Sequence, residues 1–174
     1  GWVYWDGKQL GAWTEHLERV DVLINLSGKS VDCRYTKKNK EEIFSSRLAA
    51  TRILGEAILK SFCPPNLWIN MSSATIYAHS IDKSNNESDG KIGEGFSVDV
   101  CKAWEAEFNK CLTPDTRKVL LRCAIVLGKE GGVMAPLKNL VRFRVGGAQG
   151  NGKQVMSWLH QDDLSGIVAF IMNN

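Results

Sequence analysis

Three short apolar runs, each closed by hydroxyl, amide or glycine residues, restrict the folds that this chain can adopt. They cover residues 21–28, 67–72 and 118–128. A nearly continuous apolar run of this length is typical of a strand that is buried on both faces, as in a parallel sheet. Because the carboxyl ends of parallel strands meet at one edge of a sheet, the polar residues that close the runs are predicted to form one cleft.

Helical patterns separate these runs. Residues 37–61 carry apolar side chains at a spacing close to 3.6, with Thr36 as the N-cap and Pro64–Pro65 after the last turn. Residues 97–109 repeat the helical spacing. Strands that alternate with helices predict an α/β protein with a doubly wound, Rossmann-like parallel sheet.

The two ends of the chain carry weaker patterns. We expect a short strand at Val3–Trp5, a helix after the glycine pair Gly131–Gly132, a strand at 155–159 and a final helix at 164–172. With 174 residues, the chain is predicted to form one domain.

Composition excludes several classes of protein. A net charge of +3, with acidic and basic residues interspersed, is too small to indicate nucleic-acid binding. No apolar run approaches the roughly 18 residues that a membrane span needs. The five cysteines form no CxxC pair and the three histidines stand far apart, so no metal site is predicted. Unpaired thiols and the lack of a signal-peptide pattern favour a cytoplasmic protein.

One strand end carries candidate catalytic groups. The run at 67–72 leads into Ser72 and Ser73, and Lys102 follows on the next predicted helix. A hydroxyl at a strand end, with a lysine one helix later, is an arrangement that polarises a carbonyl or an alcohol beside a nicotinamide ring. Serines at strand ends also cap the backbone, and these residues by themselves leave both interpretations open.

Four motifs occur in the order found in the extended short-chain dehydrogenase/reductases. SSATIYA resembles the serine motif of that family, NLSG resembles the turn after its fourth strand, and LLRCAIVLG resembles the strand that passes the nicotinamide. GNGKQVMSWLHQDDLSGI resembles the segment that runs through the substrate lobe. Within the NAD-dependent epimerase/dehydratase group, the chain is most similar to the epimerase family proteins, through SSRLAATRILGEAI and CKAWEAE.

The resemblance implies a dinucleotide cofactor, NADP or NAD with NADP preferred, and an unidentified small-molecule substrate for which a nucleotide-linked compound is one candidate. It makes Ser73 catalytic and gives Lys102 the place of the lysine that holds the ribose. The residues that it places beside the cofactor come from the three strand ends and the helix: Asn25, Leu26, Ser27, Gly28, Ser72, Lys102, Arg122, Cys123, Ile125 and Val126.

One departure from the family pattern concerns proton transfer. The family uses Tyr-x-x-x-Lys, in which the phenol exchanges a proton with the substrate and the lysine lowers the pKa of that phenol. The tyrosine belongs four residues before Lys102, where this chain has Val98. Tyr77, four residues after Ser73, is either a substitute acid or a structural residue.

Arginines occupy two further positions near the expected cleft. Arg47 stands where the family usually has a proton-relay asparagine, and Arg34 lies in the loop after NLSG. Either side chain could bind a carboxylate or phosphate of the substrate, or be an ordinary exposed arginine.

The family's first strand and its glycine-rich pyrophosphate turn have no counterpart in residues 1–20. We therefore expect an internal fragment that binds cofactor weakly by itself. It is predicted to form a single incomplete Rossmann-like domain over residues 1–174, in which residues 129–160 contribute to the substrate lobe. A homodimer is left open.

Functions from different classes remain. Val98 favours a non-catalytic NAD(P)-binding regulatory protein that has lost its tyrosine, whereas Ser73 and Lys102 favour an epimerase or oxidoreductase. A different reaction on the same scaffold, with Arg47 or Tyr77 in new roles, is a third hypothesis. The fold alone does not decide between them.

Overall fold

The computed structural model describes residues 1–129, 132–148 and 150–174. The chain divides into two compact units, one made of residues 1–79 and 85–122 and the other of residues 80–84 and 123–174. Gly131, the first residue of the predicted glycine turn, lies outside the described residues, as do Glu130 and Gln149.

The first unit is built on a three-stranded sheet with the strand order β1-β2-β3. Its strands are β1 (Val22–Asn25), β2 (Leu67–Ser73) and β3 (Arg117–Cys123). β1 and β2 run parallel in a register that pairs Asn25 with Asn70. The carboxyl ends of these two strands therefore meet at one edge, and the predicted α/β class is confirmed.

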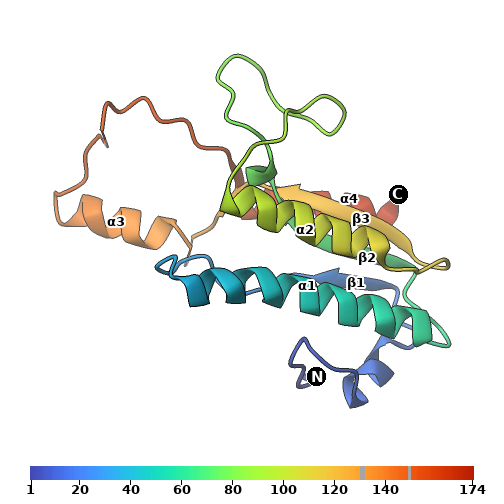
Figure 1. Cartoon of the computed structure of the whole chain (residues 1–174). Coiled ribbons are helices and arrows are strands. Elements are labelled where there is room, and N and C mark those ends of the chain that lie inside the picture. The colour runs from blue at the N-terminus through green and yellow to red at the C-terminus, as the bar shows by residue number, and fades with distance from the viewer. Residues whose placement is uncertain (130–131, 149) are drawn as a thin grey trace. The chain divides into compact units, whose positions relative to one another are not determined.

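Two helices connect the strands and lie side by side over one face of this sheet (Figure 1). They are α1 (Lys37–Lys60) and α2 (Phe96–Lys110). Thr36 caps α1 as predicted, because its side chain accepts a hydrogen bond from the Asn39 amide. α2 begins after Gly95, whose φ of 103° is one that residues with a Cβ rarely adopt.

A lysine from β3 fixes the end of α2. Lys118 Nζ donates to the backbone carbonyls of Phe108, at 2.7 Å, and Cys111, at 2.9 Å. Carbonyls in the last turn of a helix have no partner inside the helix, so the ammonium group satisfies them. Burial lowers the pKa of Lys118, and Nζ also lies 4.7 Å from the centroid of the Phe108 ring.

The core of the first unit lies between the two helices and β2. At its centre are Trp68, which is 0% exposed, and Phe108, which is 2% exposed. Their rings meet edge to face, with 4.6 Å between centroids. Leu54 and Ile58 of α1 complete this cluster, so the apolar stripe that predicts the helix is also the surface that it buries. Two short 3₁₀ helices, η1 (Ala12–Leu17) and η2 (Ala74–Ile76), complete the unit.

The described residues of the second unit form a small parallel sheet and two helices. The elements are β4 (Ile125–Leu127), α3 (Met134–Arg142), β5 (Trp158–His160) and α4 (Gln161–Asn173). His160 caps α4, since its Nδ1 accepts a hydrogen bond from the Asp162 amide at 3.3 Å. Within the described ranges, no helix has the length and apolar character that crossing a membrane requires.

Two strand predictions are wrong. Residues 118–128 do not form one strand, because the pairing is interrupted at Ala124: β3 belongs to the sheet of the first unit, whereas β4 pairs with β5. Val3–Trp5 forms no strand, and both Trp2 and Tyr4 are exposed. An aromatic pattern favours a strand only where a neighbouring strand is present to pair with it.

Replacing Phe108 by alanine should destabilise the protein by about 3–5 kcal/mol, because the change leaves a cavity against Trp68. The matched control is Phe62→Ala, since Phe62 is 94% exposed. The control should change the free energy of unfolding by less than about 0.5 kcal/mol. Urea unfolding followed by tryptophan fluorescence measures both variants, and equal losses would contradict this core.

Candidate functional site

A buried polar cluster holds the carboxyl end of β1 against the middle of β2. Asn25 Nδ2 donates to Asn70 Oδ1 at 2.7 Å and to Thr51 Oγ1 at 3.4 Å. Trp104 Nε1 donates to the same threonine hydroxyl at 2.8 Å. Asn25, Asn70 and Thr51 are at most 2% exposed. Because buried polar groups need partners, the cluster fixes α1 and α2 against the strand ends.

The turn after β1 takes its shape from Asn25. The side-chain oxygen of Asn25 accepts hydrogen bonds from the Ser27 amide, at 3.1 Å, and from the Ser27 hydroxyl. Gly28 has little room for a side chain, since a Cβ there would lie 3.1 Å from Cγ of Arg47. Leu26, between them, is 71% exposed. The glycine of NLSG is thus explained by its packing against Arg47.

Arg47 is part of the scaffold of this turn. Its Nη1 donates to the backbone carbonyls of Lys29 and Ile43, each at 3.0 Å. Its Cζ lies 5.3 Å from the centroid of the Trp104 ring. Burial lowers the pKa of Arg47. These contacts tie the loop to α1 and use one terminal nitrogen of the guanidinium for structure.

A pocket of about 480 Å³ lies beside the same turn. An ion pair between Lys29 and Glu42, with 2.5 Å between Nζ and Oε2, forms part of its wall. An aromatic ring beside hydroxyls and a carboxylate suits the base and ribose of a nucleotide. The groups that supply these features are Trp5, Asp6, Ser27, Ser45 and Ser46.

β2 leads directly into η2, and Ser73 is the N-cap of that turn. Its Oγ accepts a hydrogen bond from the Thr75 amide at 3.2 Å and donates to Thr75 Oγ1 at 2.9 Å. Ser73 is half-buried, whereas Thr75 is exposed. Ser73 therefore caps the backbone, one of the two interpretations that the sequence left open; the other was a catalytic role. A hydroxyl with two lone pairs and one hydrogen can still contact a ligand.

The two positions of the expected Tyr-x-x-x-Lys pair have different surroundings on α2. Val98 is 5% exposed and packs in a cluster with Ile76 and Cys101. Lys102 is exposed, and no hydrogen bond joins it to Ser73 in the part of the chain that the structure describes. The pKa of the Cys101 thiol is raised by burial and by the charge of Glu105. Smaller opposing effects come from Arg47, the Ser73 backbone and Arg122.

Arg122, from β3, joins a carboxylate to a phenol. Its Nε and Nη2 donate to Glu105 Oε1, at 2.9 Å, and Oε2, at 2.7 Å. Its Nη1 donates to Tyr77 Oη at 2.7 Å, and its Cζ lies 5.1 Å from the centroid of the Tyr77 ring. Ser72 Oγ donates to Glu105 Oε1 at 2.6 Å. The side chains of Arg122 and Glu105 are 24% and 12% exposed.

The charges in this network stabilise one another. Burial raises the pKa of Glu105, but the hydrogen bonds from Arg122 and Ser72, together with the charge of Arg122, outweigh burial. The pKa of Glu105 therefore lies below its ordinary value. The hydrogen bonds to Glu105 raise the pKa of Arg122, against the effect of burial and with a further contribution from Tyr77. Both groups are charged at neutral pH.

Tyr77 borders a cleft of about 630 Å³ in the first unit. Residues 91–97 and the first turn of α2, with Phe96 and Val98, form other walls of this cleft. The Tyr77 ring is also held from the loop side, because a Cβ at Gly90 would lie 2.5 Å from its Cε1 and only glycine fits there. Packing on both sides gives the phenol a defined position.

Comparison with known proteins identifies homologues of this chain. No family model matches the chain. The epimerase family protein YfhF of Bacillus subtilis is 34% identical over 161 residues, which make up 92% of this chain and 52% of YfhF. The chain is a homologue of the epimerase family proteins. It spans about half the length of the curated relatives that it matches.

Solved structures agree with this assignment. The crystal structure of human epimerase family protein SDR39U1 with NADPH matches with a TM-score of 0.79 and 29% identity, over 92% of this chain and 56% of that one. UDP-glucuronic acid 4-epimerase from Bacillus cereus, in complex with UDP-glucuronic acid and NAD, matches with a TM-score of 0.71 and 17% identity, over 92% of this chain and 52% of that one. The second match shows the fold alone. The family resemblance and the Rossmann-like fold are confirmed.

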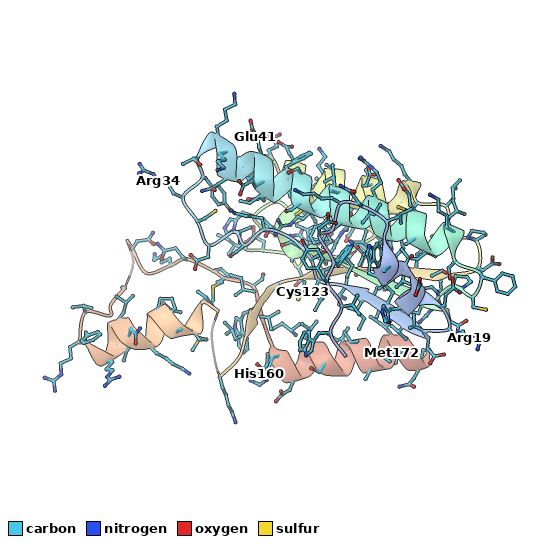
Figure 2. The ribbon with its side chains drawn as sticks, turned by 90° about the horizontal axis from the view of Figure 1, so that it is seen from below. Arg19, Arg34, Glu41, Cys123, His160 and Met172 are labelled. Carbon is cyan, nitrogen blue, oxygen red and sulfur yellow. The ribbon has the colours of Figure 1, made fainter. Side chains whose placement is uncertain are left out.

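Several predicted site residues of this epimerase family homologue lie away from the contacts described above. Arg34 is exposed on the loop before α1, near the helix turns that carry Glu41 (Figure 2). Cys123, Ile125 and Val126 belong to the second unit, and their contact with a cofactor stays a prediction. The described residues contain no group of three or more side chains that could hold a metal ion.

Sequence reasoning missed Glu105. The signal lies in α2, where Val98, Cys101 and Phe108 form an apolar stripe that includes position 105. A carboxylate in such a stripe is buried and needs a partner of opposite charge. The sequence also assigned Arg122 only to the strand beside the nicotinamide, whereas its side chain provides that partner.

The network should make the stability of this homologue depend on acid pH. Because the folded-state pKa of Glu105 is depressed, its contribution is present above the unfolded-state pKa and is lost as the pH falls through the folded-state value. Glu105→Gln should therefore cost about 2 kcal/mol near pH 7, and the difference from wild type should shrink towards about pH 3. Urea unfolding across this range measures the effect.

The control for this experiment is Glu41→Gln, a change at an exposed position on α1. It should follow the wild-type curve at every pH. A Glu105→Gln deficit that stays constant from neutral to acid pH would contradict a charge-based role for this carboxylate.

Proposed function

We propose that this chain is the cofactor-binding part of an NAD(P)-dependent epimerase or oxidoreductase that acts on a small-molecule substrate. The observation that supports the proposal is the position of Tyr77. Its phenol borders the cleft, lies 2.7 Å from Arg122 Nη1 and follows Ser73 by four residues. We take this phenol as the proton donor, because α2 carries Val98 in place of the family's tyrosine.

Two regions of the first unit have groups that fit a dinucleotide. The pocket at Trp5, Ser27 and Gly28 offers a ring and hydroxyls for the adenosine end. Ser73 and the exposed Lys102 are the proposed contacts at the reactive end. We prefer NADP, because the similar human protein was solved with NADPH.

Tyr77, Arg122 and Ser73 have different roles in the proposed reaction. A nicotinamide dinucleotide supplies hydride transfer when it is bound. Tyr77 Oη accepts a hydrogen bond from Arg122, so the phenol hydrogen is available for a substrate oxygen. Tyr77 donates this proton when a carbonyl is reduced and takes it back when an alcohol is oxidised. Arg122 places a positive charge beside the oxygen that gives up the proton, and the Ser73 hydroxyl orients the substrate.

A non-catalytic NAD(P)-binding protein is the second candidate, and the packing of Val98 favours it. Val98 is buried against Ile76 and Cys101, so a tyrosine at that position needs the cluster to repack. In this alternative, Tyr77 holds the loop around Gly90 in place and performs no chemistry.

Tyr77→Phe should lower the rate of hydride transfer by about 10²–10⁴-fold, because it removes the proton donor and keeps the ring. The dissociation constant of the dinucleotide should stay unchanged. Nicotinamide absorbance with a panel of aldehydes, ketones and nucleotide sugars measures the rate, and nicotinamide fluorescence measures binding.

Tyr4→Phe is the matched control, because Tyr4 is 87% exposed and the variant should keep the wild-type rate. Undiminished turnover in Tyr77→Phe would contradict the assignment of Tyr77 as the acid. A wild-type protein that binds dinucleotide and transfers no hydride to any of these compounds would support the second candidate. Because the chain by itself is expected to bind cofactor weakly, binding is measured on the full-length protein, and its failure to bind either dinucleotide would contradict both candidates.

A further inference from the structure

We infer that Glu105 is a positioning residue that acts through Arg122 to direct the phenol of Tyr77, an inference that rests on the proposed function. Glu105 is 9% exposed and is connected to Tyr77 through hydrogen bonds of Arg122 to both residues. The sequence around it carries no motif for this role. The inference therefore depends on the geometry of four hydrogen bonds.

The first step is the orientation of Arg122. Its guanidinium is planar, and the edge formed by Nε and Nη2 is held by the two oxygens of Glu105, at 2.9 and 2.7 Å. A bidentate pair of this kind fixes the plane as well as the position of the group. With Nε and Nη2 fixed, Nη1 can point in one direction only, and that direction leads to Tyr77 Oη at 2.7 Å.

The second step is the anchoring of Glu105 itself. Ser72 Oγ donates to its Oε1 at 2.6 Å, and Ser72 is 6% exposed at the end of β2. The carboxylate is therefore held between a helix and two strands of one sheet, which move less than a loop does. Ser72 also precedes Ser73 directly, so one carboxylate organises the strand end that carries the serine and the arginine that contacts the phenol.

The third step concerns the hydrogen of the phenol. Arg122 has no lone pair to accept a hydrogen bond, so Tyr77 Oη must be the acceptor in their contact. The phenol hydrogen then points away from Arg122, and no hydrogen bond donated by Tyr77 Oη is found among residues 1–129, 132–148 and 150–174. Glu105, by fixing Arg122, makes Tyr77 a donor towards the cleft.

The chain offers a close control on the same helix. Glu107 lies two residues after Glu105, its side chain is also 12% exposed, and it pairs with Arg52 through an Nε–Oε1 contact of 2.6 Å. That pair connects α2 to α1 and has no contact with Tyr77. Glu107→Gln therefore removes an ion pair from the same helix without the proposed connection.

The test is the ¹⁹F NMR spectrum of the protein labelled with 3-fluorotyrosine. The chain has three tyrosines, Tyr4, Tyr35 and Tyr77, and the signal that is lost in Tyr77→Phe identifies the one of interest. Glu105→Gln should move the Tyr77 signal and leave the other two in place, whereas Glu107→Gln should move none of them. If Glu105→Gln does not fold, Glu105→Asp takes its place, because it keeps the charge and shortens the side chain that holds Arg122.

The same variants should separate positioning from binding in kinetics. Glu105→Gln should lower kcat by about tenfold to a hundredfold while KM changes by less than about twofold, and Glu105→Asp should recover part of the loss. An unmoved Tyr77 signal in Glu105→Gln, or an equal movement in Glu107→Gln, would overturn the positioning role. If the signal moves as expected but Tyr77→Phe keeps full turnover, the geometry holds and the proposed function fails.

Discussion

The hydroxyl of Thr51 is the interaction on which the arrangement of the first unit depends. It is 0% exposed and accepts hydrogen bonds from Asn25 and Trp104, so one oxygen joins β1, α1 and α2. A buried hydroxyl without a partner costs about 1–3 kcal/mol. Close packing of the helices on the sheet therefore requires the hydrogen bonds from Asn25 and Trp104 to Thr51. The contact also fixes Asn25, whose side chain shapes the turn after β1.

α2 serves the site with two kinds of side chain on one face. Near its start, Val98 and Cys101 pack against Ile76 of η2, and Val98 also lines the cleft. Glu105 lies one turn after Cys101 and two turns after Val98, is buried on the same face and pairs with Arg122. A buried ion pair adds little to net stability, because both groups lose their hydration. It does select a single orientation of the arginine. That orientation in turn sets the direction of the Tyr77 phenol, which matters more to a proton donor than a gain in the stability of the fold.

The sequence predicts well those features that depend on local periodicity. The start of α1 at residue 37 and its cap at Thr36 are confirmed, and Asn25 and Ser73 lie at the ends of strands that adjoin in the sheet, as expected. The break at Ala124 could not be predicted, because the apolar run continues through it and only the choice of neighbouring strand divides it. The Glu105–Arg122 pair is also missed, since a helix pattern does not reveal which strand will face it. Sequence patterns indicate that a side chain is buried; the partner depends on the tertiary fold.

The cap that Lys118 provides for α2 has a consequence for the order of folding. The lysine reaches carbonyls only seven and ten residues before it, at Cys111 and Phe108. Closing so short a loop costs little chain entropy, whereas the contact between Asn25 and Asn70 closes a loop of 45 residues. α2 and the first residues of β3 can therefore assemble as a local unit before the long-range pairing is made, and β1 with α1 can dock on it afterwards. The segment that carries Glu105 and Arg122 is therefore expected to fold before the rest of the first unit.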